Sequence, residues 1–149
     1  MSTRGFASRD GDSAANVVNL PEHATAGSFV AGDLVNVAGG KVRILQSDQN
    51  IFGIALGKAS GTADTDIPVE VISPDKVYVA QADTTTAVTQ VNNDYGLNIG
   101  TAGNMSVDIG DTSTTSVVVV DLDPRDAVGT NGGRLLVKFT TAALDTATP

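Results

Sequence analysis

Apolar and polar residues alternate with a period of two in several short stretches of the chain. Residues 33–37 and 41–45 alternate in this way, and only Ala38-Gly39-Gly40 separates them. Successive side chains of a strand point to opposite faces, and a short connection rich in glycine favours a hairpin, so these two stretches are predicted to pair. The expected buried face carries Val35, Val37, Val42 and Ile44, and the expected solvent face carries Asn36, Lys41 and Arg43.

Two further regions show strand patterns of different kinds. Residues 51–57 form a short, nearly continuous apolar run bounded by glycines, which is typical of a strand buried on both faces. Residues 67–72 and 76–80 flank a turn at Ser73-Pro74-Asp75 and predict a second hairpin. Pro68 cannot donate a ladder hydrogen bond, so it is expected among the first residues of its strand or on a sheet edge.

The remaining strands are predicted at residues 17–20, 95–99, 106–109, 116–121 and 134–139. Asp83 could cap a short helix through residues 84–91, although three consecutive threonines disfavour it. Frequent turn residues between short strands indicate an all-β fold, either a small β-sandwich or a β-barrel of antiparallel strands with at most one short helix. The alternation pattern is the same in a β-sandwich and in a β-barrel, so the sequence does not distinguish between these two folds.

The two ends of the chain show neither the period of two of a strand nor the periodicity of a helix. Residues 1–16 are small and polar, and we expect a flexible N-terminal arm. Residues 17–139 are expected to form a single β-rich domain, and residues 140–149 a tail of small residues. The beginning of the chain has no apolar run of a signal peptide, and no stretch approaches the ~18 apolar residues of a membrane span. A soluble protein made in a cytoplasm is therefore expected.

Composition excludes several classes of function. The chain has 149 residues and a formal charge of -8, so nucleic acids and anionic membrane surfaces are expected to be repelled. It contains no cysteine, which excludes disulfides, thiolate metal sites and cysteine nucleophiles. Hydrophobic residues make up 41% but aromatic residues only 4%, which favours a core of aliphatic side chains in a sheet.

The chemistry-bearing residues give little support to catalysis. His23 is the only histidine, and a solvated loop histidine is favoured over a catalytic base. The hydrolase signature Gly-x-Ser-x-Gly is absent. We therefore expect no enzyme and no cofactor.

Carboxylates could instead supply oxygen ligands for Ca²⁺ or Mg²⁺. The candidate group is Asp121, Asp123 and Asp126, with Asp108 and Asp111 as further members. The stretch from Asp121 to Asp126 contains a proline and an arginine and lacks the pattern of an EF-hand, so solvated carboxylates at strand ends are favoured. The same interpretation applies to Asp64 and Asp66.

Two local motifs are interpreted as incidental. Gly53-Ile-Ala-Leu-Gly-Lys58 has the wrong glycine spacing for a phosphate-binding loop, and Ala59 replaces the required hydroxyl residue. The glycines there are expected to let a strand bend or approach its neighbour closely. Asn104-Met-Ser106 is a formal glycosylation sequon without an accompanying signal peptide.

The isolated Arg4, Phe6 and Arg9 of the N-terminal arm are the remaining binding candidates. The arm is either simply disordered or orders against a partner. In the second case an extended segment adds a strand to a sheet edge and arginines pair with carboxylates.

The patterns Gly32-Asp-Leu-Val, Gly39-Gly-Lys-Val, Ile51-Phe-Gly-Ile-Ala-Leu and Ile67-Pro-Val-Glu-Val resemble the head-decoration, or capsid cement, proteins of tailed bacteriophages. The similarity covers residues 29–80, with a looser match at Asp94-Tyr-Gly-Leu-Asn and in residues 133–139. It is a pattern of strands and glycines and not a diagnostic motif.

The resemblance implies a structural protein on the outside of the phage head, commonly a homotrimer at three-fold positions. Such a protein clamps neighbouring subunits of the major capsid protein, and family members often use an N-terminal segment for it. Only residues 1–16 could match that role here, so Arg4, Phe6 and Arg9 are the expected capsid-binding residues.

Two alternatives from other classes remain. One is a receptor- or carbohydrate-binding β-module of a phage tail or surface structure, which would need exposed aromatic side chains. The aromatic residues are Phe6, Phe29, Phe52, Tyr78, Tyr95 and Phe139, most of them inside strand patterns. The other is a metal-dependent enzyme that uses the carboxylates between Asp121 and Asp126.

Overall fold

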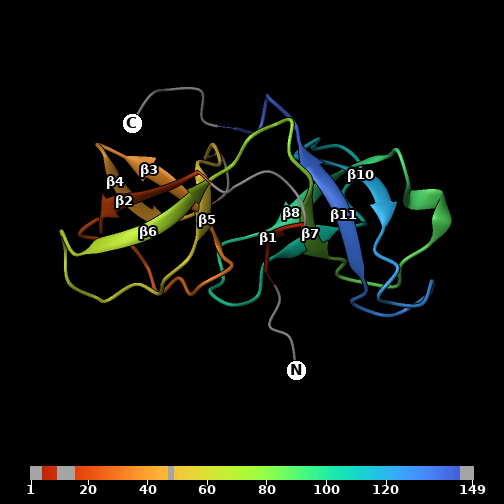
Figure 1. Cartoon of the computed structure of the whole chain (residues 1–149), viewed down its shortest axis with the longest axis horizontal. Coiled ribbons are helices and arrows are strands. Elements are labelled where there is room, and N and C mark those ends of the chain that lie inside the picture. Colours follow the sequence, from red (N-terminus) through yellow and green to blue (C-terminus); the bar gives the residue numbers. More distant parts are fainter. Residues whose placement is uncertain (1–4, 10–15, 47–48, 145–149) are drawn as a thin grey trace.

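The structure is a computed structural model that describes residues 5–9, 16–46 and 49–144. Two antiparallel sheets of six and five strands lie next to each other along the long axis of the molecule (Figure 1). The predicted all-β class is confirmed, and the architecture is a small β-sandwich without a closed barrel. The buried apolar side chains of the two sheets form one continuous core.

The six-stranded sheet contains the C-terminal half of the chain and one strand from its beginning. Across the sheet the strands are β1 (Ala7–Ser8), β7 (Tyr78–Gln81), β11 (Arg134–Phe139), β10 (Val117–Leu122), β8 (Asp94–Asn98) and β9 (Ser106–Asp108). All neighbouring strands are antiparallel. The predicted strand at residues 134–139 is found with the same bounds.

The five-stranded sheet follows the order β2 (Val17–Pro21), β6 (Asp66–Val71), β5 (Gly53–Ala55), β3 (Leu34–Ala38) and β4 (Lys41–Ile44). The predicted hairpin is confirmed, because β3 pairs with β4 and places Val37 opposite Val42. The three residues of β5 are all buried, as predicted for the apolar run.

Asn36 departs from the expected pattern. The alternation predicts Asn36 on the solvent face of the hairpin, but it is only 7% exposed. Its side-chain amide donates to the backbone oxygen of Asn50 at 2.8 Å, and its side-chain oxygen accepts from Nε of Arg43 at 3.0 Å. Because these hydrogen bonds replace those to water, the amide can be buried at this position.

The second predicted hairpin is wrong. Strand β6 pairs with β2 on one edge and with β5 on the other, whereas β7 pairs with β1 and β11 in the other sheet. Since both edges of β6 are occupied, β7 cannot pair with it. The turn after β6 therefore carries the chain from one sheet to the other, and the backbone N–H of Ser73 donates to the hydroxyl of the buried Tyr78 at 2.9 Å.

The helix considered for residues 84–91 is reduced to the 3₁₀ helix η1 (Val88–Gln90). Thr86 pairs with Thr130 in a neighbouring loop, through a backbone hydrogen bond of 3.2 Å. Pro68 is the third residue of β6, and its backbone oxygen accepts from Leu56, just beyond the end of β5. The missing N–H of Pro68 therefore falls opposite Leu56, where the pairing of β5 with β6 has ended.

The beginning of the described chain is part of the fold and does not form a free arm. Phe6 is 3% exposed, and its ring centroid lies 5.7 Å from that of Phe139. The backbone N–H of Phe6 donates to Gly32 at 2.9 Å, and that of Arg9 donates to Val77 at 3.2 Å. Burial of the Phe6 ring stabilises the docking of this short strand against the sheet. Residues 1–4 and 10–15 of the expected arm lie outside the described residues.

Asp33 ties the two sheets together at their junction. Its carboxylate is completely buried and accepts hydrogen bonds from Val30 at 2.9 Å and from Gly103, in the loop between β8 and β9, at 3.0 Å. Burial raises the pKa of Asp33, because the charged form is less well solvated in the interior.

Candidate functional site

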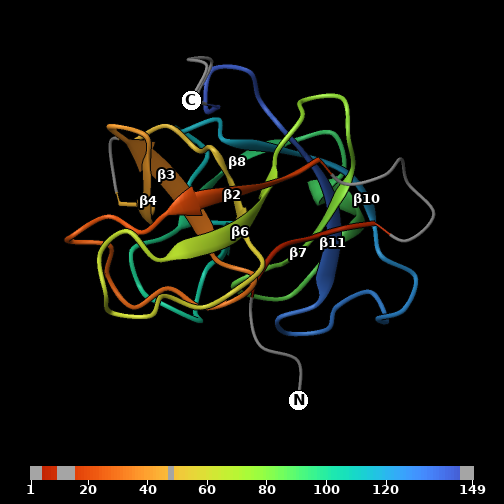
Figure 2. The ribbon, with the colours of Figure 1, turned by 60° about the vertical axis from the view of Figure 1, so that its left-hand side comes forward.

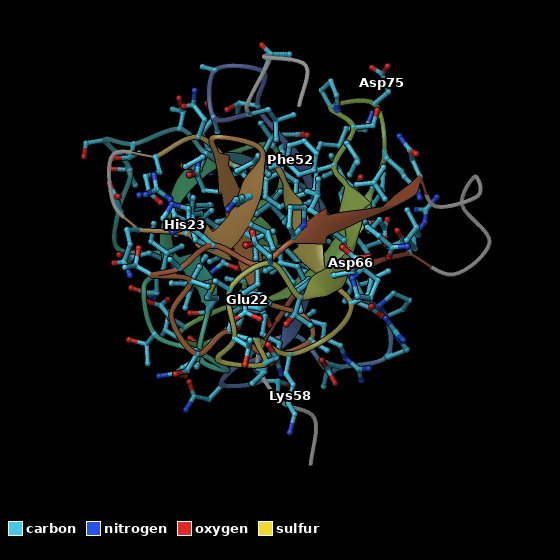
Figure 3. All side chains as sticks on the ribbon, turned by 90° about the vertical axis from the view of Figure 1, so that its left-hand side faces the viewer. Glu22, His23, Phe52, Lys58, Asp66 and Asp75 are labelled. Atoms are coloured by element: carbon cyan, nitrogen blue, oxygen red, sulfur yellow. The ribbon has the colours of Figure 1, made fainter. Side chains whose placement is uncertain are left out.

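His23 lies in the turn after β2, where its ring supports the local backbone. Its Nδ1 accepts a hydrogen bond from the backbone N–H of Thr25 at 3.0 Å. Figure 3 shows Asp66 and Asp75 well separated from His23, and the nearer carboxylate, that of Glu22, accepts hydrogen bonds from Ser60 and Gly61. Within the described part of the chain no carboxylate hydrogen-bonds to this ring, so the base-and-orienter arrangement of a catalytic triad is not formed there.

The carboxylates after β10 bind arginines. Asp123 is 3% exposed and accepts from Nε of Arg125 at 3.0 Å, so the expectation of a solvated carboxylate is wrong for this residue. Asp126 accepts from the backbone N–H of Arg134 at 2.8 Å and from its Nε at 2.9 Å. These hydrogen bonds lower the pKa of Asp126 to about 2. Asp121 is exposed.

The other acidic candidates do not come together in a common site either. Asp64 forms an ion pair with Lys41 at 2.6 Å, and Asp66 is exposed at the beginning of β6. The pKa of Asp108 is raised by burial and by the neighbouring Asp83. Among the residues that the structure describes, no group of three acidic or histidine side chains could hold a metal ion.

Gly53 has the role expected for a strand glycine. A Cβ atom at this position would lie 2.3 Å from the backbone oxygen of Glu70 and 2.7 Å from a methyl group of Val69. Strands β5 and β6 therefore approach closely because residue 53 has no side chain.

Of the three predicted capsid-binding residues, the structure places two. Phe6 is in the core and Arg9 is exposed, whereas Arg4 lies outside the described residues. Phe6 is thus not presented to a partner in this conformation.

A buried ion pair next to β1 was not predicted. Lys76 and Glu70 are 7% and 5% exposed, and their Nζ and Oε2 atoms are 3.4 Å apart. The hydroxyl of Ser8 donates to the same Oε2 atom. These three residues come from β1, β6 and the connection between β6 and β7, so the pair fixes the first strand against both sheets.

Glu22 is a further buried charged residue that the sequence did not reveal. It is 2% exposed and accepts from the backbone and hydroxyl of Ser60 at 2.9 and 2.7 Å and from the backbone of Gly61 at 3.0 Å. Its carboxylate organises the loop between β5 and β6 and is not available to a ligand.

A groove of about 680 Å³ lies between the two sheets. This volume lies within the range of ~300–1,000 Å³ that is usual for binding sites. The lining residues are Leu45, Gln49, Asn50, Ile51, Leu97, Ile99, Asp111, Ser113, Thr114, Thr115, Ser116, Ala142 and Ala143. Leu45 and Ile51 are buried, and Leu97 and Ile99 are half-buried, so the groove has an apolar floor.

Hydrogen bonds hold the polar rim of the groove in place. Oδ1 of Asp111 accepts from the backbone and hydroxyl of Ser113 at 3.1 and 2.9 Å and from the backbone of Thr114 at 3.1 Å. The Ser113 hydroxyl and the Thr114 backbone N–H lower the pKa of Asp111. On the opposite side, the backbone N–H of Ile51 donates to Ala143 at 2.9 Å.

The groove offers apolar contacts, hydroxyl and amide groups, and one carboxylate. Among the described residues, its lining contains one carboxylate, that of Asp111, and no histidine, lysine, arginine or aromatic residue. It therefore lacks a nucleophile–base pair and a cationic site for phosphate. Sequence reasoning missed it because its walls come from five separate segments of the chain, none of which carries a motif.

The aromatic side chains are withdrawn from the surface. All six are 6% exposed or less: Phe6, Phe29, Phe52, Tyr78, Tyr95 and Phe139. Recognition of sugars by stacking on aromatic rings thus has no exposed platform in this conformation.

No protein-family model matches the chain, and no similar protein was found among curated proteins or solved structures. In the described part of the chain, no helix is long and apolar enough to cross a membrane.

Proposed function

We propose that the protein is a non-enzymatic structural protein that decorates the outer surface of a tailed-phage head and binds segments of the major capsid protein. The groove between the sheets carries this proposal. Its apolar floor and its rim, in which hydroxyl and amide groups surround the single carboxylate of Asp111, suit a polypeptide segment, which offers apolar side chains and backbone hydrogen-bonding groups. The resemblance of residues 29–80 to capsid cement proteins supports the same function.

Such a role needs no active site. A homotrimer would make three equivalent contacts, and linked contacts of modest strength give firm attachment through their high effective concentration. A protein that binds only the mature lattice stabilises that lattice by mass action. In this proposal the groove supplies the contact, Arg9 is exposed just after β1, and Phe6 serves to dock the strand.

The receptor- or carbohydrate-binding alternative has less support. It relied on exposed aromatic side chains, and all six are buried. The buried rings also explain how the core is filled in a chain without tryptophan.

Two measurements test the proposal. The first is the copy number and position of the protein in purified particles, by quantitative mass spectrometry and electron cryomicroscopy. Hundreds of copies at three-fold positions on the outer surface are expected. A few copies at the tail, or none in any particle, would refute the proposal and bring the binding-module alternative forward.

The second measurement tests the groove with Ala142→Glu, which places a charge at an exposed position of its lining. A buried, unpaired carboxylate opposes binding, so affinity for expanded heads should fall by at least about tenfold. Ala24→Glu makes the same charge change in an exposed turn outside the groove and is the matched control. Equal affinity of both variants and the parent would exclude the groove as the contact.

A further inference from the structure

One wall of the groove between the sheets is the segment that follows β11. Figure 2 shows this segment running from β11 toward the five-stranded sheet. There the backbone N–H of Ile51 donates to Ala143 at 2.9 Å, and Ile51 forms a parallel bridge with Leu144. The opposite wall is the connection between β9 and β10, which contributes Asp111 and residues 113–116. A molecule that fills the groove therefore covers Asp111.

Asp111 is held in place by hydrogen bonds and has no cation beside it. Ser113 and Thr114 donate three hydrogen bonds of 2.9–3.1 Å to its Oδ1 atom. A Cβ atom at Gly96 would lie 2.2 Å from its Oδ2 atom, so the absence of a side chain there leaves room for the second oxygen. The four ion pairs among the described residues all involve other carboxylates. The charge of Asp111 is therefore not balanced by a lysine or arginine in the described part of the chain.

This wall of the groove stays negative at neutral pH. The hydroxyl of Ser113 and the backbone N–H of Thr114 lower the pKa of Asp111, because they stabilise its ionised form. The backbone N–H of Asp111 donates to Asp108 at 3.1 Å. Burial and the charges of Asp83 and Asp111 raise the pKa of Asp108, so these carboxylates lie near one another and add to the negative potential.

A ligand that covers this wall without a positive charge is disfavoured. Covering an ionised carboxylate removes its hydration, and without an opposite charge nothing compensates for that loss. A carboxylate with a lowered pKa does not escape the cost by taking up a proton at neutral pH. A cationic side chain removes the penalty, because charge-assisted hydrogen bonds are about twice as strong as neutral ones. The apolar floor of the groove accepts aliphatic side chains at the same time.

We propose that the polypeptide segment that occupies the groove carries a lysine or arginine that pairs with Asp111, next to aliphatic residues that pack on Leu45, Ile51 and Leu97. The inference rests on the proposed function, because it names the chemistry of the partner for the same groove. The net charge of -8 favours this class of partner as well, since it attracts cationic segments before contact. Asp111 thus determines which segment binds, and the apolar floor supplies contact area.

Two short peptides test the cation on the unmodified chain. One is acetyl-Ala-Leu-Lys-Leu-Ala-amide, and the other has norleucine in place of lysine, which keeps the aliphatic stem and lacks the charge. Titration followed by the amide chemical shifts of the protein in NMR spectra gives both affinity and position. We expect the lysine peptide to bind at least about fivefold more tightly and to shift the amides of Ile51, Leu97 and Thr114. High salt should reduce this preference.

Asp111→Asn is the matched variant, because an asparagine oxygen can still accept from Ser113 and Thr114 while the charge is removed. Asp75→Asn makes the same change at an exposed position outside the groove and is the control. We expect Asp111→Asn to abolish the preference for the lysine peptide and Asp75→Asn to retain it. Amide shifts that match the parent outside residues 108–116 would show that the fold is kept.

Binding to expanded heads separates this inference from the proposed function. Asp111→Asn should lower the affinity for heads by at least about fivefold. Parent-like affinity of Asp111→Asn, combined with a loss in Ala142→Glu, would keep the groove as the contact and overturn the cationic partner. No head binding by the parent, combined with a peptide preference that depends on Asp111, would refute the proposed function alone. Equal binding of both peptides to the parent, or a lysine peptide that shifts no groove amide, would overturn the inference.

Discussion

Replacing Phe6 by alanine should substantially destabilise the protein, although the residue belongs to a stretch without any strand periodicity. The side chain is 3% exposed and packs against Phe139 at a centroid distance of 5.7 Å. An aromatic residue of this kind buries ~150–250 Å². At about 25 cal/mol per Å² this area corresponds to roughly 4–6 kcal/mol, and Phe→Ala changes in protein cores cost about 3–5 kcal/mol.

The free energy of unfolding that Phe6→Ala can remove has an upper limit, which the structure sets. Strand β1 contains two residues, and its other contacts are a few backbone hydrogen bonds and the Ser8–Glu70 contact. Once the ring is gone, the segment can detach as a whole. The destabilisation by Phe6→Ala therefore cannot exceed that of a chain that begins at residue 10. We expect the two free energies of unfolding to agree within a few tenths of a kcal/mol, the usual error of such comparisons.

Urea unfolding monitored by circular dichroism measures both variants, with Arg9→Ala as the control. Arg9 is exposed in the same segment, and its replacement should change the free energy of unfolding by less than about 0.5 kcal/mol. A loss below about 1 kcal/mol for Phe6→Ala would show that residues 5–9 are not docked in solution and would refute the reasoning, because burial alone requires more.

Three further predictions concern backbone approach, buried charge and acid stability. Gly53→Ala should cost about 3 kcal/mol, because the new Cβ would lie 2.3 Å from the Glu70 oxygen, whereas Gly110→Ala, whose nearest contact is at 3.4 Å, should be tolerated; urea unfolding compares them. Lys76→Met should cost about 3–5 kcal/mol by leaving the Glu70 carboxylate unpaired, and adding Glu70→Gln should recover much of this in a double-mutant cycle, an outcome that a simple cavity effect would not give. The hydrogen bonds from Arg134 lower the pKa of Asp126 from 3.8 to about 2, so the Asp126 carboxylate stabilises the folded protein above pH 4 and loses this effect as the pH falls toward 2. Asp126→Asn should therefore be less stable than the parent at pH 6. Thermal melts should show this difference in stability closing below pH 4.

Most strands could be predicted because alternation is a local property of the chain. The hairpin of residues 33–45 and the strand at residues 134–139 carry it in full, and both were found where expected. The pattern reports which residues share a face, but it does not report the partner strand. For this reason the hairpin expected on either side of Pro74 was wrong, since β6 and β7 belong to different sheets.

The buried charges were hidden for a related reason. Glu70 and Lys76 are charged residues next to predicted strands, and such residues are normally solvated. Their burial depends on each other and on the Ser8 hydroxyl, which is more than sixty positions away in the sequence. Likewise Phe6 has no periodic neighbours, and only its contact with Phe139 gives it a place in the core.

The sequence by itself determined that this protein is an all-β chain with an aliphatic core, a strongly acidic surface and no cysteine chemistry. These properties follow from composition and from the period of two, which act over a few residues. The tertiary structure decided which strands pair, that residues 5–9 dock in the sheet, and that a groove lies between the two sheets. Those features arise where segments distant in sequence meet, and a local pattern contains no information on which segments will do so.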